Sequence, residues 1–248
     1  MARTLPGGVA DRDPHGGGAP RRGKEARFGV GTWHGTPSPY LALEGSWDSY
    51  RHSLKSKLRQ NLRNRERRLA AEGELKFQIY RAAGEGMRGA LEDSLEIEAS
   101  SWKGTQGSAI RQDNALLDFY RAWLEVAAQE GWLRLGMLRV SGRPVAFDLS
   151  VAFAGTQFCL KIGFERDFAA FSPGQLLCQE MLRRCFEEEC APPLREYDFL
   201  GGVTPQKLDW TGSLREVGWI HLYRRNLRGW LVHALKFRLA PIVRRHRT

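Results

Sequence analysis

The chain has 248 residues, of which 42% are hydrophobic, and it contains eight Trp. This length and composition suit one large or two small folded domains and argue against a largely disordered chain. No run of 18 or more apolar residues occurs, and the start lacks the apolar segment of a secretory signal. We therefore expect a cytoplasmic protein with no membrane span.

The net charge of +10 is unevenly distributed along the chain. Residues 1–26, 55–68 and 221–248 carry +2, +6 and +8, a total of +16, which leaves −6 for the remainder. An acidic body argues against a nucleic-acid partner, which calls for a basic face on the folded module itself. The basic segments are suited to attract an anionic surface or cofactor.

The first 72 residues show little periodic pattern until a helix near their end. Residues 1–26 hold six Gly and three Pro and predict a disordered leader. Residues 27–50 are rich in turn residues, with a short extended piece at 40–43, and Ser46 is suited to cap a helix over 47–72. This helix carries an apolar stripe of Leu54, Leu58, Leu62 and Leu69 among basic residues. It is expected either to lie over the core by its Leu stripe or to grip phosphate with its basic face.

The next part of the chain alternates between strand and helix patterns. Short connections make three successive strands antiparallel neighbours, and a Ser-Pro-Gly loop follows them. The predicted elements are a strand at 76–82, helices at 87–102 and 114–129, strands at 133–140, 145–154 and 157–164, a helix from Ser172 to about 189, a strand at 196–200, a short helix at 205–216, a strand at 219–224 and a basic helix at 228–245.

This order predicts an α/β (α+β) fold with one central, mostly antiparallel sheet flanked by helices. We expect four parts: the leader at 1–26, a connecting segment with the basic helix at 27–72, the main domain at 73–225 and the basic C-terminal helix at 226–248.

The loop from Phe168 to Gln175 ends a strand and begins a helix. Backbone N–H groups at a helix start have no intrahelical acceptor and attract anions. We expect Gly174, Gln175 and Leu176 to offer such groups, with Ser172 as the helix cap. An ordinary cap and turn without a ligand is the alternative.

Several short motifs, in their order and spacing, resemble the GNAT acyltransferase fold, and within it the CelD/BcsL-type branch related to FemAB aminoacyl transferases. The similarity covers roughly residues 40–225. The motifs are Ser101-Trp102-Lys103-Gly104, Gly142-Arg143-Pro144-Val145-Ala146-Phe147-Asp148, Leu160-Lys161-Ile162-Gly163, Ser172-Pro173-Gly174-Gln175-Leu176-Leu177 and Tyr197-Asp198-Phe199-Leu200-Gly201-Gly202, followed by Lys207 and Trp210.

The resemblance implies a GNAT-like domain that binds acyl-CoA, such as acetyl-CoA, between two diverging parallel strands. Its pyrophosphate would lie on the helix that begins near Ser172. The residues expected to bind it are Phe171, Ser172, Pro173, Gly174, Gln175 and Leu176. Trp102 and Lys161 are expected at the substrate. Members of this branch often carry a further GNAT-like half, so this chain is expected to be a short form.

Candidate catalytic residues lie on the predicted strands. Asp148 sits in the middle of a strand, where burial would raise its pKa toward that of a general base. Its alternative is a structural pairing with Lys161 or with an Arg. Lys161 could itself orient an anionic substrate. Asp198 and Lys207 are expected at the acceptor site, although Asp198 could instead cap the Gly201-Gly202 turn.

Other residues complete the set of candidates. Tyr197 or Tyr223 could protonate the leaving thiolate, or simply belong to the core. The four Cys lack a C-x-x-C spacing and are expected as reduced thiols, and the six His show no metal-ligand spacing, so no metal is expected.

Together these patterns predict an N-acyltransferase that moves an acyl group from acyl-CoA to an amine. The resemblance suggests an amine on a sugar or envelope-polysaccharide precursor as acceptor. The alternatives are a FemAB-like aminoacyl transfer to a cell-wall precursor and a non-catalytic GNAT-like binding module. The basic, Trp-containing C-terminal helix suits a membrane surface, a partner or packing on its own domain.

Overall fold

The computed structural model describes residues 28–100, 113–188, 193–224 and 226–235. The chain divides into two compact units. The larger spans residues 34–217, and the smaller combines the segment ending at Trp33 with the segment beginning at Gly218. Each unit is described separately.

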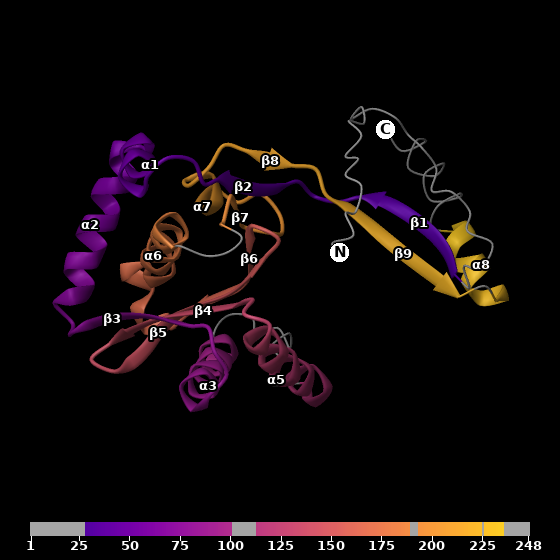
Figure 1. Cartoon of the computed structure of the whole chain (residues 1–248), viewed down its shortest axis with the longest axis horizontal. Helices are drawn as coiled ribbons and strands as arrows, with labels where there is room; N and C mark the ends of the chain where they lie inside the picture. The colour runs from indigo at the N-terminus through magenta and orange to yellow at the C-terminus, as the bar shows by residue number, and fades with distance from the viewer. Residues whose placement is uncertain (1–27, 101–112, 189–192, 225, 236–248) are drawn as a thin grey trace, which may run out of the picture. The chain divides into compact units, whose positions relative to one another are not determined.

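The larger unit is built on a seven-stranded sheet in the order β3-β4-β5-β6-β7-β2-β8 (Figure 1). Every neighbouring pair is antiparallel except β6 and β7, which run parallel. The strands are β2 (Ser38–Ala42), β3 (Leu75–Tyr80), β4 (Leu133–Val140), β5 (Arg143–Phe153), β6 (Thr156–Phe164), β7 (Glu196–Asp198) and β8 (Leu214–Arg215). The predicted fold class, a mostly antiparallel sheet flanked by helices, is confirmed.

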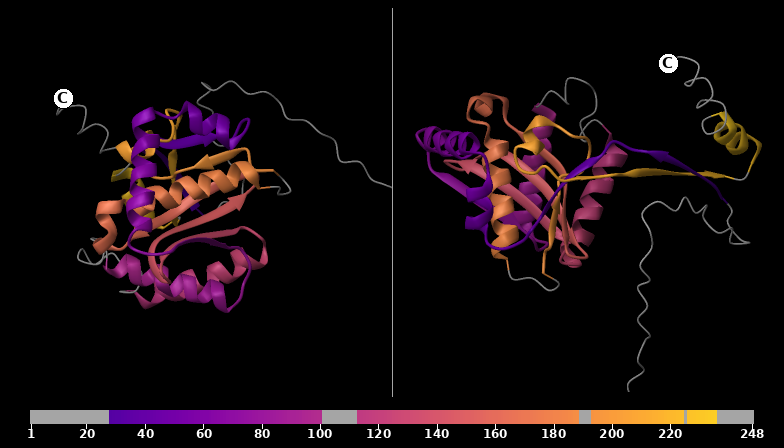
Figure 2. Two further views of the ribbon diagram at one scale, coloured as in Figure 1. Left: turned by 90° about the vertical axis from the view of Figure 1, so that its left-hand side faces the viewer. Right: turned by 90° about the horizontal axis from the view of Figure 1, so that it is seen from above.

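Helices cover both faces of this sheet, giving three layers (Figures 1 and 2). Helices α1 (Trp47–Ser53), α2 (Ser56–Ala70) and α6 (Pro173–Glu187) share one core, and α3 (Glu85–Ser100) and α5 (Asn114–Gln129) share the other. Strand β4 supplies both cores because successive side chains point to opposite faces. Leu138 joins the α6 side, whereas Leu135 and Met137 join the α3 and α5 side.

One glycine sets how closely α6 approaches the sheet. A Cβ atom at Gly136 would lie 2.5 Å from the sulfur of Met181, closer than side chains tolerate. The missing side chain on β4 therefore lets Met181 of α6 fill that space.

The connection from β6 through α6 to β7 creates the feature that matters for function. The two parallel strands pair only from Thr156 with Glu196 to Phe158 with Asp198. Beyond Phe158, β6 continues to Phe164 with no described strand on that edge. The sheet therefore splays at the C-terminal ends of two parallel strands, which is where α/β sheets bind ligands.

The predicted helix over residues 47–72 is broken in two. Ser46 caps α1 as expected, accepting a hydrogen bond from the Ser49 N–H at 3.2 Å. Leu54 then turns extended, with ψ of 151°, before α2 begins. The break lets the Leu stripe follow the core across both segments, and its members Leu54, Leu58, Leu62 and Leu69 are all buried.

The smaller unit corrects two further predictions. Strand β1 (Phe28–His34), in a region expected to be turn-rich, pairs with β9 (Gly218–Arg224) in a separate two-stranded sheet. The last strand was expected in the central sheet. Helix α8 (Leu227–Ala234) follows β9. A strand pattern fixes which residues alternate but not which distant strand they meet, and the choice of partner is what sequence reasoning missed.

One short helix is also smaller than expected. Residues 205–216 were predicted helical, but α7 spans only Pro205–Leu208. Thr204 caps it and Pro205 occupies its first turn, while Leu214 and Arg215 instead join the sheet edge as β8.

Candidate active site

A cavity of about 630 Å³ opens where β6 and β7 diverge. Three segments wall it: the outer half of β6, the start of α6 after the η2 turn (Arg166–Phe171), and the stretch from Phe199 to Trp210. The apolar part of the wall includes Leu160, Ile162, Phe164, Ala169, Phe199, Leu200 and Trp210. An elongated ligand with both apolar and polar groups would fit such a wall.

Asp148 lines this cavity from the middle of β5, and its side chain is only 2% exposed. Its carboxylate accepts hydrogen bonds from the hydroxyl of Ser150, from the Tyr197 hydroxyl at 3.1 Å and from the Cys159 thiol at 3.7 Å. All three donors are neutral. Among the described residues, none forms an ion pair with Asp148.

This environment raises the pKa of Asp148 from its ordinary 3.8 to about 6, because burial penalises the charged form. The hydrogen bonds from Ser150, Tyr197 and Cys159 oppose the rise without cancelling it. A carboxylate with this pKa is ionised at neutral pH and is a stronger base than an exposed aspartate. These are the properties of a general base.

The groups around Asp148 stay protonated. Burial raises the pKa of the Tyr197 hydroxyl and of the Cys159 thiol well above their usual values, and the nearby Asp148 charge acts in the same direction. Burial likewise raises the pKa of the Cys178 thiol, which also lines the cavity. None of the described thiols Cys159, Cys178 and Cys185 forms a disulfide.

A bulge in the sheet shapes this cluster. The pairing of β5 with β6 shifts register between Leu149 and Ser150, so Leu149 faces Lys161 while Ser150 faces Cys159. Bulges locally re-aim side chains and are frequent beside active sites. The sequence carries no local signal for it, and the Asp148–Cys159 contact could not have been found without the register.

Lys207 also lines the cavity, and it holds the Gly-Gly turn. Its ammonium group donates to the carbonyl oxygens of Leu200 and of Gly202, the latter at 3.1 Å. Burial lowers the pKa of Lys207 below its usual value. A Lys ammonium has three N–H donors, and the described contacts engage two of them.

The start of α6 offers fewer free N–H groups than expected. The N–H groups of Gln175 and Leu176 both donate to the Ser172 carbonyl, Pro173 has no N–H, and the Ser172 N–H donates to Ala169. Only the Gly174 N–H has no described backbone acceptor in this loop. The Ser172 side chain makes no capping hydrogen bond. The expectation of three free N–H groups at this helix start is therefore wrong.

Gln175 contributes a side chain instead. Its Oε1 accepts a hydrogen bond from the Trp210 indole at 3.0 Å, and both residues line the cavity. Because an indole nitrogen can only donate, this contact fixes which end of the carboxamide faces Trp210. The N–H donors of the Gln175 amide nitrogen therefore remain available for another acceptor.

Two residues at the cavity adopt a left-handed backbone that side chains rarely take. Ser172 has φ of 48° and Leu200 has φ of 47°, and each lines the cavity. This conformation costs about 1–2 kcal/mol for a residue with a side chain. Such strain gathers at ligand sites, where the surrounding fold holds it in place.

Asp198 occupies a different environment from Asp148. One of its oxygens accepts from the Ser38 hydroxyl and from the Leu200 N–H, both at 2.8 Å, and the other faces Arg215 at 3.4 Å. It is buried and is not among the residues that line the cavity. These contacts match the capping of the Gly-Gly turn.

Lys161 lines the cavity but does not pair with Asp148, and that structural alternative is wrong. Its ammonium group contacts the buried Glu98 of α3 and lies 5.6 Å from the centre of the Tyr120 ring. Adjacent residues on a strand point to opposite faces, and the paired residues Leu149 and Lys161 share the α3 side of the sheet.

Some of the remaining candidate site residues line the cavity and others do not. Ser172 and Gly174 line the cavity with Gln175, whereas Phe171, Pro173 and Leu176 do not. Phe171 packs beneath the Arg68 guanidinium at 5.3 Å from the ring centre, and Leu176 is core. Trp102 lies outside the described residues. Sequence reasoning did not single out Ser150, Cys178 or Thr204, because only the folded chain brings them to this place.

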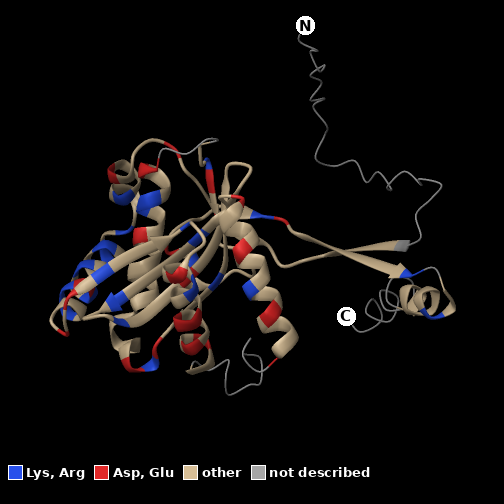
Figure 3. Cartoon of the chain, turned by 60° about the horizontal axis from the view of Figure 1, so that its bottom comes forward, with Lys and Arg blue, Asp and Glu red and all other residues tan. Residues whose placement is uncertain are grey.

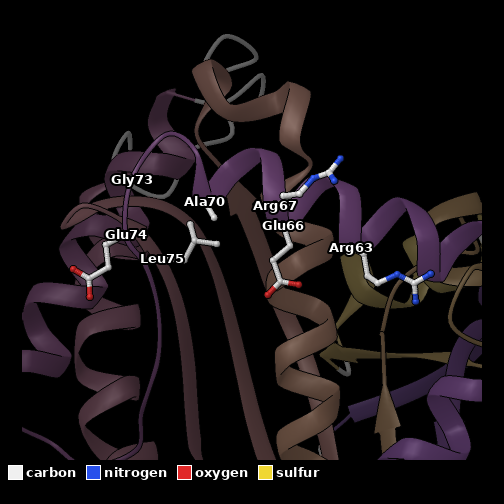
Figure 4. A pocket seen from close by; sticks show the side chains of 7 residues that line it. All are labelled: Arg63, Glu66, Arg67, Ala70, Gly73, Glu74 and Leu75. Atoms are coloured by element: carbon white, nitrogen blue, oxygen red, sulfur yellow. The ribbon is translucent and has the colours of Figure 1, made fainter.

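A second hollow of about 440 Å³ lies at the end of α2 and shares no lining residue with the first. Figure 4 shows Arg63, Glu66 and Arg67 on α2 and Glu74 beyond the turn. Both signs of charge mix there, and none of these four residues has a left-handed backbone. The described residues also contain no group of three or more potential metal ligands. The cavity between β6 and β7 is therefore the candidate active site.

The comparison with protein families decides the chain's class. Residues 56–208, more than half of the chain, match the family model described as "Acetyltransferase (GNAT) domain". This protein belongs to the GNAT acetyltransferase domain family. The matched range begins with α2, ends with α7 and includes every residue named above as lining the cavity except Trp210.

Solved structures agree on the fold of this GNAT chain. A conserved protein of unknown function from Bacteroides thetaiotaomicron VPI-5482 has 15% identity and a TM-score of 0.51, covering 79% of this chain and 62% of its own. FemX has 10% identity and a TM-score of 0.52, covering 81% of this chain and 63% of its own. The chain therefore spans less than two thirds of these two solved chains. A search of the curated proteins found no match.

Proposed function

We propose that this GNAT domain catalyses acyl transfer to an amine in the cavity between β6 and β7, with Asp148 as the general base. The observation that carries the proposal is a buried carboxylate with only neutral partners on the wall of that cavity. Acyl transfer requires an amine acceptor to lose a proton, and in this proposal Asp148 receives it.

The donor we propose is an acyl-CoA, with acetyl-CoA as the first candidate. The unpaired edge of β6 beyond Phe158 offers backbone groups to an extended, amide-bearing chain such as the pantetheine arm. The Gly174 N–H and the α6 start offer positive potential to phosphate. CoA supplies the activated thioester, and the protein supplies its position.

Three polar groups at the cavity are suited to the rest of the reaction. The Gln175 amide nitrogen and the third Lys207 donor could stabilise negative charge that develops on the acyl oxygen. The proton that the leaving thiolate needs could come from Tyr197, which keeps its hydroxyl proton and would regain one through Asp148. In this scheme Tyr197 gives its proton to the leaving thiolate, and the proton that Asp148 takes from the amine then restores the Tyr197 hydroxyl.

The acceptor proposed is an amine on a sugar or envelope-polysaccharide precursor in the cytoplasm. This part rests on the resemblance of the sequence motifs to the CelD/BcsL-type branch. Asp198 and Lys207 stand beside the Gly-Gly turn where such an acceptor would enter, and we propose Lys207 as the contact from that side.

One observation favours a second candidate function. With a single free N–H, the α6 start holds a pyrophosphate less fully than a loop with several free donors would. An aminoacyl donor, as in FemAB-like transferases, would not need that cradle. Aminoacyl transfer to a cell-wall precursor is therefore the alternative, with the same base and the same cavity.

Thermal unfolding with acyl-CoAs tests the choice of donor. Acetyl-CoA is expected to raise the Tm, because a ligand that binds only the folded state stabilises it. Gly174→Glu should abolish the shift by placing a carboxylate at the phosphate position. Gly174→Ala is the matched control: its Cβ would lie 3.8 Å from Phe164, an ordinary contact, so the shift should persist.

The outcomes separate the candidates. No shift with any acyl-CoA, but a shift with aminoacyl-tRNA, would replace the first candidate with the second. No shift with either donor would contradict both and leave a non-catalytic module.

A further inference from the structure

The smaller unit carries an apolar surface that its described residues do not cover. Helix α8 shows large apolar side chains at the spacing of a single helical face, here called the α8 stripe: Leu227, Trp230, Leu231 and Leu235, the last at the helix C-cap. These side chains are 51–83% exposed. Soluble proteins rarely leave such a contiguous stripe open unless something binds it.

The opposite side of α8 is the side that packs against its own strand. A Cβ atom at Gly229 would lie 2.0 Å from the Arg224 carbonyl oxygen, so the helix backbone sits directly on the end of β9. The His233 ring meets the Tyr223 ring of β9 edge-on, with centres 5.6 Å apart. In an ordinary surface helix the apolar stripe faces the core. Here a glycine and a histidine face inward, and the stripe faces away from β9.

The described residues of β1, β9 and α8 carry charge of one sign only. Residues 218–248 contain eight Lys or Arg and no Asp or Glu, and the described residues 28–33 contain no charged residue at all. Arg224 and Arg228 are described and exposed. Figure 3 shows blue and no red on α8 and the strands beside it.

We propose that the α8 stripe is a docking surface for an anionic lipid bilayer, on which α8 lies in the interface plane. Trp and Leu side chains would enter the boundary between headgroups and acyl chains, and Arg224 and Arg228 would meet the anionic headgroups. The described part of the chain contains no helix long and apolar enough to cross a bilayer. The proposed contact is a peripheral one, with α8 lying on the bilayer surface.

Two alternatives fit the charge less well. A second copy of this chain would bring another purely basic segment against the first, and like charges repel. A protein partner would have to carry acidic residues at matching positions, whereas an anionic bilayer presents negative charge over its whole surface. The combination of an apolar face with positive charge alone is characteristic of interfacial helices.

Vesicle flotation with the full chain tests the proposal. The protein should bind phosphatidylcholine vesicles that contain phosphatidylglycerol and should bind pure phosphatidylcholine vesicles much more weakly. Added salt should weaken the binding, because it screens the headgroup charge. Leu231→Glu should lower the partition coefficient at least about tenfold, since it places a charge within the apolar face.

A matched variant guards against a general effect of added negative charge. Phe119→Glu makes the same kind of change at an exposed aromatic residue of α5, in the larger unit, and should leave vesicle binding nearly unchanged. Brominated lipids should quench Trp fluorescence in the unmodified chain and quench it much less in Trp230→Phe. Gly174→Glu, which tests the acyl-CoA site, should bind vesicles normally.

Three results would overturn the proposal. One is the absence of binding to anionic vesicles, and another is equal binding to neutral and anionic vesicles. The third is a dimer in light scattering that Leu231→Glu dissociates without any change in vesicle binding, which would show that a second copy covers the stripe.

Discussion

The larger unit holds two buried aspartates on two strands of one sheet, and they illustrate opposite uses of a buried carboxylate. Asp148 on β5 and Asp198 on β7 are 2% and 3% exposed. Around Asp198, a guanidinium, a backbone N–H and a hydroxyl satisfy the carboxylate and hold a turn. Around Asp148 only neutral donors are present, and the carboxylate borders a cavity.

The difference shows that burial alone does not make a catalytic carboxylate. Asp198 is ion-paired, and its carboxylate oxygens accept the hydrogen bonds that hold the turn. Asp148 keeps a raised pKa because no cation offsets its desolvation. The sharpest tests therefore change one aspartate and ask whether activity or stability responds.

The largest effect is expected from Asp148→Asn. Losing the general base should slow acyl transfer by about 10²- to 10⁴-fold. Release of free thiol from acetyl-CoA, measured with a panel of amine acceptors, would follow this loss. Unchanged turnover in Asp148→Asn would remove Asp148 from the mechanism.

The same variant should be more stable than the unmodified chain at neutral pH. A carboxyl pKa that rises on folding means that the folded state holds the proton more tightly than the unfolded state does. The contribution of Asp148 to stability is therefore most favourable at low pH, and it falls as the pH rises from about 4 to about 6. Above pH 6 the charged Asp148 lowers the free energy of unfolding by on the order of 2–3 kcal/mol. Denaturant unfolding at pH 8 and pH 4 should show a gain for Asn only at pH 8.

Asp198→Ala should show the opposite pattern, with a loss of stability that dominates. Removing the carboxylate leaves the Ser38 hydroxyl and the Leu200 N–H without their acceptor. Two buried donors without partners should lower the free energy of unfolding by about 2–4 kcal/mol. A variant that stays as stable as the unmodified chain would show that Asp198 does not hold this turn.

Tyr197→Phe should produce a smaller shift in pH dependence. The Tyr197 hydroxyl bonds to the carboxylate and lowers the pKa of Asp148, so removing it should raise that pKa further. The acidic limb of the rate profile, where Asp148 must lose its proton, should move to higher pH by up to about one unit. A limb that moves to lower pH would contradict the described hydrogen bond.

The smallest effect is expected from Arg215→Met. Arg215 bridges Glu196 at 2.5 Å and Asp198 at 3.4 Å, but its side chain is 43% exposed. Partly exposed ion pairs contribute little, so the loss of stability should be below about 1 kcal/mol. A loss comparable to that of Asp198→Ala would mean that the ion pair, not the two neutral donors, holds Asp198.

The sequence predicted some features of this site and missed others, for physical reasons. Periodicity and short turns located the strands around Asp148, and desolvation of a mid-strand carboxylate correctly pointed to a raised pKa. The partner of Lys161 could not be inferred, because side-chain pairing depends on register and on which helix covers each face. The backbone N–H groups of Gln175 and Leu176 donate to the carbonyl of Ser172, whose left-handed backbone no residue pattern predicts.

The division into two units was hidden for a related reason. Residues 28–34 and 218–224 lie at opposite ends of the sequence, and neither pattern indicates the other as its partner. The alternation in Gly218–Arg224 identifies a strand but would serve equally in the central sheet. The break at Leu54 similarly depends on the core that α1 and α2 must both cover, a tertiary constraint that outweighs helix propensity.

The most direct test of the contrast between the two aspartates is a ¹³C NMR titration of the aspartate carboxyl groups, with the Asp148 signal assigned by its loss in Asp148→Asn. The structure predicts a midpoint near pH 6 for Asp148. Bound acyl-CoA should move this midpoint upward, because the ligand would displace water from the cavity. A midpoint near 4 that acyl-CoA leaves unchanged would contradict the assignment of this cavity as the acyl-transfer site.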